Sequence, residues 1–159
     1  MENVRDATRR LLVSVLLVSA ASCNQTQIQS LPFERALPAN GVAREEFAVV
    51  KKQLYSVEIN YKYSSAPGDR DRVWKLSGGP ELGAPFSVDT QITSGSGEKR
   101  KIKAVRPTLT SWGAENLSAE VGRVELDPGR YIIELQLIGG RLPPNLAATY
   151  SIRRAHTGK

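Results

Sequence analysis

The chain has 159 residues, with 22 Lys and Arg against 16 Asp and Glu, which is the size of a single domain with a mildly basic surface. Its only histidine, His156, lies three residues from the C-terminus and its only cysteine is Cys23, so composition excludes a closed structural zinc site and argues against Ser-His-Asp or Cys-His catalysis. We therefore expect no enzymatic activity, no cofactor, no metal and no nucleic-acid partner.

Residues 1–22 have the pattern of an export signal. A polar segment ends in Arg9-Arg10, and a run of apolar or small residues follows from Leu11 to Ala21. A transmembrane helix needs about 20 apolar residues, and this run is about half that length. The pattern therefore predicts a signal peptide that is cleaved rather than kept as an anchor.

The residues at the predicted cleavage point, Ala20-Ala21-Ser22-Cys23, resemble the lipobox of bacterial lipoproteins. The resemblance implies that Cys23 receives a diacylglyceryl thioether and becomes the acylated first residue. Ordinary cleavage near Ala20 or Ser22 is the alternative, but it leaves an unpaired thiol in an oxidising compartment. We expect a protein held by the lipid on Cys23 in the cell envelope, facing the periplasm, at the outer rather than the inner membrane.

The rest of the chain divides into a tether, one domain and a tail. Residues 23–40 are predicted to be the lipidated N-terminus and a flexible tether, because polar residues and prolines follow Cys23. Residues 41–155 alternate with a period of two, which is typical of half-buried strands. They predict an antiparallel β-sandwich of about eight strands, immunoglobulin-like or jelly-roll-like, with residues 156–159 as a tail.

Two segments give the strongest strand patterns. Leu54 to Tyr63 carries aromatic and β-branched residues on one face and polar residues on the other. Tyr131 to Ile138 is apolar on one face and partly on the second, which indicates a central strand. Apart from the export signal, only Ala114 to Val121 has a marginal helical pattern. Shorter predicted strands are Glu46 to Val50, Arg72 to Leu76, Phe86 to Ile92, Lys101 to Val105, Gly122 to Leu126 and Thr149 to Arg153.

A proline-glycine turn precedes the late strand. Pro128 and Gly129 predict a type II turn, which requires a positive φ at the glycine. The segment Leu126 to Tyr131 resembles the L-x-P-G-x-Y entry to a late strand in immunoglobulin-like and related bacterial sandwich domains. The resemblance implies that Tyr131 packs at the corner of the fold, which is a structural role.

The wider pattern joins the lipobox, the tyrosine-rich early strand, the segment Val73-Trp74-Lys75-Leu76-Ser77-Gly78 and the late Pro-Gly-Arg-Tyr turn. It resembles a group of small uncharacterised proteobacterial lipoproteins with a sandwich domain, over most of residues 33 to 153. The resemblance implies a fold and a location, and it brings no established activity and no catalytic residue.

Two features are candidates for contact with a partner. Lys99, Arg100, Lys101 and Lys103 follow a flexible Gly-Ser-Gly segment and are candidates for binding anionic headgroups. The alternative is a charged edge strand that discourages aggregation. Trp112 lies in a loop-like setting and is either a partner contact or an anchor in the core. For both features we favour the second interpretation.

The leading functional hypothesis is a non-catalytic envelope protein that binds another envelope protein or supports an assembly. One alternative is an immunity or secretion-apparatus lipoprotein that acts on a single protein partner. A carboxylate-dependent hydrolase is the other alternative, with Asp69, Asp71, Glu115 or Asp127 as its acids, but their spacing does not suggest a converging pair. Asp69 and Asp71 also alternate with arginines, which opposes a Ca²⁺ site.

Replacing Cys23 by serine tests the lipidation. One acyl chain binds a membrane only marginally, so stable anchoring requires at least two. We expect Cys23→Ser to convert a membrane-bound protein into a soluble or unprocessed form, measured by membrane fractionation and by mass spectrometry of the mature N-terminus. A mature protein that begins at another residue, or that keeps an unmodified thiol, contradicts the lipoprotein hypothesis.

Overall fold

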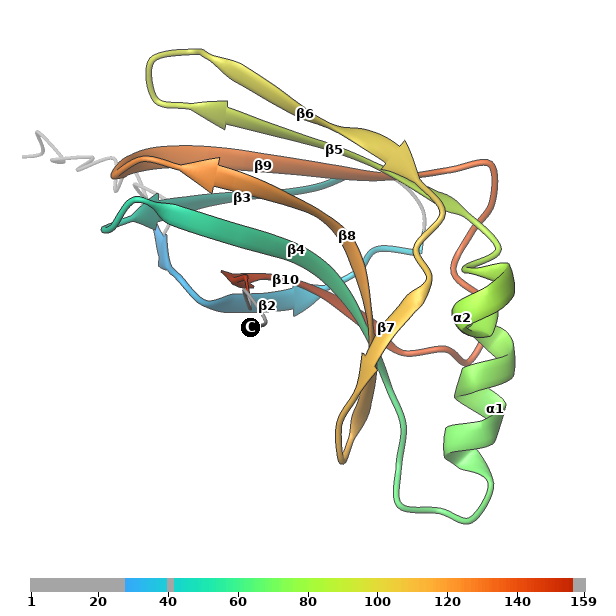
Figure 1. Ribbon diagram of the computed structural model, residues 1–159. Helices are drawn as coiled ribbons and strands as arrows, with labels where there is room; N and C mark the ends of the chain where they lie inside the picture. Colours follow the sequence, from blue (N-terminus) through green and yellow to red (C-terminus); the bar gives the residue numbers. More distant parts are fainter. Residues whose placement is uncertain (1–27, 40–41, 156–159) are drawn as a thin grey trace, which may run out of the picture.

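The computed structural model describes residues 28–39 and 42–155, which form two five-stranded β-sheets packed face to face, with two short helices at one end (Figure 1). The predicted all-β sandwich is confirmed, with ten strands in these residues instead of about eight. Sheet A has the order β1-β3-β9-β5-β6, and sheet B has the order β2-β10-β4-β8-β7. All the pairings are antiparallel except β1 with β3. The elements are β1 (Gln29–Ser30), β2 (Phe33–Ala36), β3 (Val42–Val49), β4 (Gln53–Lys62), α1 (Asp69–Leu76), α2 (Gly79–Leu82), β5 (Ser87–Ser94), β6 (Lys99–Val105), β7 (Leu109–Trp112), β8 (Asn116–Leu126), β9 (Gly129–Ile138) and β10 (Ala148–Arg154).

Part of the expected tether belongs to the sandwich. Residues 23–40 were predicted to be flexible, but β1 pairs with β3 and β2 pairs with β10. Phe33 of β2 is buried, and its ring lies 5.8 Å from that of Phe47 and 6.1 Å from that of Tyr150. A strand of four residues is too short to show a clear alternation, so the prolines around it dominated the sequence pattern. Residues 24–27 lie outside the described residues.

The predicted strand Arg72 to Leu76 is wrong, because these residues form most of helix α1. Gly68 precedes the helix in a left-handed conformation with a φ of 79°. Acidic residues occupy the first turn, where their negative charge interacts favourably with the helix dipole. Val73 is buried and Leu76 packs against the core one turn later. Two turns of helix are too few for a 3.6-residue period to stand out from an alternation.

The marginal helical pattern over Ala114 to Val121 is also wrong, because most of this segment lies in strand β8. A β-bulge explains the false signal. Val57 of β4 pairs with Gly122 and the next residue pairs with Glu120, so Val121 is an extra residue in β8. After the bulge, the side chains that would have faced solvent face the core instead. The apolar residues before and after the bulge therefore do not share one period of two.

The strong strand Leu54 to Tyr63 is the central strand β4 of sheet B, and its apolar stripe faces sheet A as expected. Tyr55, Val57, Ile59 and Tyr61 are all nearly or fully buried. The late strand β9 lies between β3 and β5 in sheet A, which confirms its predicted central position. These two strands form the middle of the core.

Two tyrosines hold the chain where it crosses between the sheets. Tyr131, near the start of β9, donates its hydroxyl to the carbonyl of Asp127 at 2.9 Å and stacks on Phe47. Tyr55, near the start of β4, donates in the same way to the carbonyl of Lys51 at 3.0 Å. Each bond reaches back four residues, as in the tyrosine corner of immunoglobulin-like domains. The structural role predicted for Tyr131 therefore has a counterpart in the other sheet.

The turn before Tyr131 differs from the expected type II turn. Gly129 has a φ of 159°, and it already pairs with Val49 as the first residue of β9. A type II turn requires a φ near +80° at this position. The proline-glycine pair therefore ends one strand and begins the next without forming that turn.

Three tyrosine-to-phenylalanine variants test the corners. Tyr131→Phe and Tyr55→Phe each remove a bonded hydroxyl and should lower the free energy of unfolding by about 1 kcal/mol. Tyr61 is the control, because its buried hydroxyl has no hydrogen-bond partner among the described residues and burial raises its pKa. Tyr61→Phe should leave stability unchanged or raise it. Tyr131→Ala should cost about 3 to 5 kcal/mol.

These differences are measured by urea denaturation of the three phenylalanine variants side by side. A loss in Tyr61→Phe as large as that in the other two contradicts the assignment of the corner hydrogen bonds.

Candidate functional site

Two tryptophans lie together at the end of the sandwich that carries the helices. Trp74 belongs to α1 and Trp112 is the last residue of β7, and their ring centroids are 6.4 Å apart with the planes tilted by 58°. Trp74 packs against the core, whereas Trp112 is 62% exposed. The interpretation of Trp112 as a core anchor is therefore wrong, because β7 is a short edge strand that leaves its last side chain in solvent.

Hydrogen bonds fix the two segments of the chain that carry the tryptophans. The hydroxyl of Tyr63 donates to the carbonyl of Gly113 at 2.5 Å, and the amide of Gly113 donates to the carbonyl of Asn116 at 2.8 Å. These bonds fix the turn that follows Trp112. On the other side, the guanidinium of Arg72 bonds both Asp69 and the carbonyl of Asn145, which ties α1 to the loop before β10.

A groove of about 400 Å³ lies beside Trp74 and is lined by that residue, Lys75 and residues 78–82. Its floor requires glycine at two positions. A Cβ on Gly78 would lie 1.7 Å from the carbonyl oxygen of Gly83, and one on Gly79 would lie 3.1 Å from the indole nitrogen of Trp74. The backbone of Gly79 therefore packs closely against the indole of Trp74 at this groove.

The rim of this groove is open to solvent and combines apolar residues with the charged residues Lys75 and Glu81. Leu82, at the end of α2, is 78% exposed, and Pro80 is exposed between it and Trp74. Together, Trp74, Trp112, Pro80 and Leu82 form the tryptophan surface. Large exposed apolar side chains that cluster in this way are typical of contact sites for other proteins.

The predicted basic residues lie on a different part of the molecule. They belong to β6, which is an edge strand of sheet A. Arg100 pairs with Glu98 at 3.1 Å and Lys101 pairs with Asp89 at 3.0 Å, so two of the cations are neutralised, while Lys99 is exposed. The position of β6 favours the charged edge strand over a headgroup site formed by these residues alone. The side chain of Lys103 lies outside the described residues.

The predicted lipidation site, Cys23, also lies outside the described residues. Among the residues that are described, no helix is long and apolar enough to cross a membrane. The structure therefore leaves the lipid on Cys23 as an expectation from the sequence.

The four carboxylates considered for hydrolysis do not all lie together, because Asp69 and Asp71 belong to α1 and Asp127 lies between β8 and β9. Asp69 accepts hydrogen bonds from the amide and hydroxyl of Ser64 and from Arg72, which lower its pKa to about 2. Asp127 lies at the opposite end of the sandwich and pairs with Lys52 at 3.0 Å. Within residues 28–39 and 42–155, no group of three acidic, histidine or cysteine side chains is arranged to hold a metal ion.

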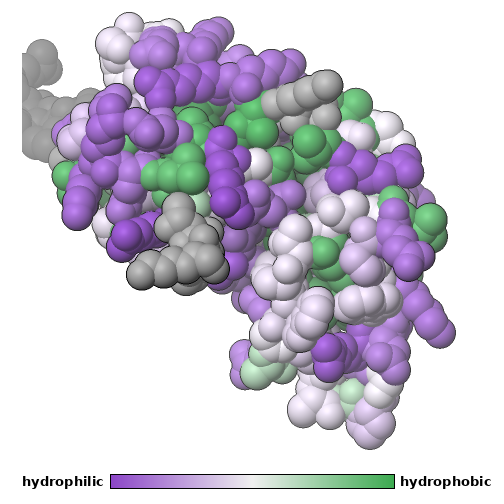
Figure 2. All heavy atoms as spheres, viewed as in Figure 1, coloured by the Kyte–Doolittle hydropathy of each residue, from purple (hydrophilic) through white to green (hydrophobic). Residues whose placement is uncertain are grey.

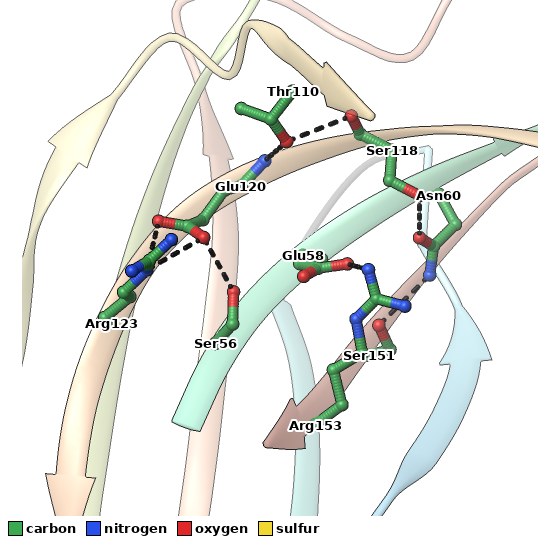
Figure 3. Close-up of polar contacts among 9 residues, drawn as sticks. All are labelled: Ser56, Glu58, Asn60, Thr110, Ser118, Glu120, Arg123, Ser151 and Arg153. Atoms are coloured by element: carbon green, nitrogen blue, oxygen red, sulfur yellow. Dashed lines mark hydrogen bonds and ion pairs between the residues drawn. The ribbon is translucent and has the colours of Figure 1, made fainter. Parts of the chain in front are cut away.

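A buried polar face on sheet B was not predicted. Its central residues, on β4, are Ser56, Glu58 and Asn60, and they point away from the core yet are almost fully buried (Figure 3). Asn60 donates to Ser151 of β10 at 3.1 Å and accepts from Ser118 of β8 at 2.8 Å. Period-two patterns identify polar positions, but they do not show that side chains of neighbouring strands will cover them.

The carboxylates that β4 and β8 contribute to this polar face are matched by arginines. Glu58 pairs with Arg153 of β10, and Glu120 accepts two hydrogen bonds from the Nε of Arg123 at 2.9 and 3.0 Å (Figure 3). Residues three apart in a regular strand point to opposite faces, but the bulge at Val121 brings Glu120 and Arg123 to the same face. These groups bond one another, so the face links β10, β4 and β8.

A comparison with known protein families shows which family this chain belongs to. Residues 30–143, which are most of the chain, match the family described as "Domain of unknown function (DUF5625)". The chain belongs to this family. The match ends before β10, although β10 lies inside sheet B, so the folded unit extends beyond the part that defines DUF5625. No curated protein matches this DUF5625 chain.

A solved structure resembles the fold of this DUF5625 chain. A crystal structure of a protein from Sulfurospirillum deleyianum has a TM-score of 0.60 and 14% identity, over 78% of this chain and 97% of that one. A pre-peptidase C-terminal domain of collagenase from Bacillus anthracis is similar at a TM-score of 0.40 and 9% identity, over 79% of this chain and 91% of that one. At 14% identity the first likeness supports the sandwich fold alone.

The pair formed by Glu58 and Arg153 gives an asymmetric prediction. Glu58 is only 7% exposed, whereas the side chain of Arg153 is 41% exposed. Arg153→Met leaves a buried carboxylate without a counter-charge and should lower the free energy of unfolding by about 3 kcal/mol. Glu58→Gln leaves an arginine that can turn to solvent, so it should cost about 1 kcal/mol. Urea denaturation measures both, and equal costs would contradict the asymmetry.

Proposed function

We propose that this DUF5625 protein is a lipid-anchored protein of the cell envelope with a non-catalytic binding role. In this proposal the lipid on Cys23 holds it facing the periplasm, at the outer rather than the inner membrane, and its partner is another envelope protein. The lipobox-like segment and the resemblance to proteobacterial lipoproteins support the location. The tryptophan surface supports the binding role.

The observation that carries the binding role is the exposure of Trp112 beside the groove. Tryptophan is enriched among the residues that dominate binding energy at protein interfaces. Such residues contribute most where they pack into a pocket that excludes water. Trp112 is 62% exposed and leans against Trp74, so its ring is held in place before any partner arrives. Little rotamer freedom is then lost on binding, which favours affinity.

The alternative of an immunity or secretion-apparatus lipoprotein requires the same kind of surface. It differs in demanding one dedicated partner at a fixed ratio. A binding or structural role in the envelope also allows several partners. The two hypotheses are therefore separated by the number of different partners that bind the tryptophan surface and by the molar ratio at which they bind.

A comparative pull-down from native membranes tests the proposal. Tagged lipoprotein is recovered in mild detergent as wild type, as Trp112→Ala and as Val50→Ala. Val50 is the matched control, because it is an exposed apolar residue at the opposite end of the sandwich. We expect Trp112→Ala to lower the affinity for the recovered partner at least about thirtyfold, as for a binding hot spot, and Val50→Ala to retain it.

Thermal unfolding of the three proteins should be the same, since both substituted side chains are in solvent. Unchanged recovery of the same partner by Trp112→Ala shows that the tryptophan surface is not the binding site.

A further inference from the structure

One end of the sandwich is built from turns instead of helices. This turn end consists of residues 50–53, 94–100, 125–130 and 154–155, and it lies opposite α1 and α2 (Figure 1). It is held together by the amide of Gly95, which donates to the carbonyl of Arg130 at 2.8 Å, and by Lys52, which pairs with both Glu125 and Asp127. The turn end is therefore one connected surface formed by both sheets.

The first strand reaches the sandwich close to the turn end. Gln29 pairs with Phe47, which is two residues from the end of β3 and five residues from Val42 at its start. At about 3.4 Å per residue, Gln29 is about 7 Å from the turn end of β3 and about 17 Å from the other end. Cys23 lies six residues earlier, so an extended chain reaches at most about 20 Å from Gln29. With a lipid on Cys23, this reach is long enough for the turn end to touch the bilayer surface.

The turn end carries a surplus of positive charge. Its cations number six and its carboxylates three, which leaves a surplus of three; they are Lys51, Lys52, Lys99, Arg100, Arg130 and Arg154 against Glu98, Glu125 and Asp127. Lys52 and Arg100 are paired with these carboxylates, whereas the other four cations form no ion pair with any described residue. In Figure 2 hydrophilic surface predominates at this end. Cations near an anionic membrane surface strengthen binding to it.

An apolar residue projects from the same surface. Val50 lies in the turn between β3 and β4, directly before Lys51, and it is 89% exposed. Nothing in the described chain covers it. An exposed apolar side chain beside a cation suits the headgroup region of a bilayer, where apolar burial and attraction to anionic lipids act together.

We propose that the turn end rests on the anionic headgroups of the membrane that holds the lipid, with Val50 at the level of the headgroups and the tryptophan surface directed away from the membrane. The proposal rests on the proposed lipid on Cys23. It assigns the two ends of the sandwich to different partners, namely lipid at the turns and protein at the helices.

Fluorescence quenching in vesicles tests this orientation. Full-length lipoprotein, purified from membranes, is reconstituted into vesicles of phosphatidylethanolamine and phosphatidylglycerol that contain a headgroup spin label. The variants Val50→Cys and Leu82→Cys each offer one free thiol for a fluorophore, because Cys23 is blocked by its lipid. They are a matched pair, since both replace exposed aliphatic residues, at opposite ends of the sandwich. We expect strong quenching at position 50 and little at position 82.

The charges give a second measurement on the same samples. In the Val50→Cys protein, the further replacements Lys51→Gln and Arg130→Gln should each lower the ratio of bound to free turn ends about fivefold, and phosphatidylcholine vesicles should lower it more. Salt of about 1 M, which shortens the screening length to about 3 Å, should act in the same direction.

Mass spectrometry of each preparation separates the two levels of the argument. If Cys23 carries lipid and position 82 is quenched as strongly as position 50, the orientation is wrong while the anchor stands. If Cys23 carries no lipid, both the anchor and the orientation are wrong.

Discussion

The packing of the two sheets depends on how the chain crosses between them. At two of these crossings, from β3 to β4 and from β8 to β9, a tyrosine hydroxyl reaches back four residues to a backbone carbonyl, Tyr55 to Lys51 and Tyr131 to Asp127. Lys52 of the first crossing forms ion pairs with Glu125 and Asp127 beside the second. Because each tyrosine ring is also buried, a shift of either crossing would disturb the core and a hydrogen bond together. The central strands β4 and β9 begin at these points, and the other strands pair outward from them.

The sequence predicted the elements that obey a simple period. β4 and β9 stand out because each is a long central strand, with one face that reads apolar without interruption. β2 was missed because four residues carry too little periodicity, and its burial comes from Phe47 and Tyr150, which are distant in sequence. The sequence of β8 resembled that of a helix because the bulge interrupts the alternation of core-facing and outward-facing side chains. Each failure has a cause that a local pattern does not contain.

The candidate site, like the fold, could be predicted from the sequence only in part. Trp112 was identified as a possible contact from its loop-like setting, but its exposure depends on β7 being a short edge strand beside α2, which is a property of the topology. The polar face on β4 was visible only as alternate polar residues. Its burial arises because Arg153 and Ser151 of one neighbour and Ser118 and Glu120 of the other bond across it. Such a network fixes the strand register, since a slip by one residue would move every partner to the other face.

The position of β10 affects the order in which the protein can fold. It is the last strand of the chain, yet it lies between β2 and β4, so sheet B joins residues from both ends of the sequence. Until the C-terminal residues are available, β2 has no neighbour in its sheet and one edge of β4 is open. Contacts of such long range form late and slowly. Sheet B therefore cannot be completed during synthesis until β10 has left the ribosome.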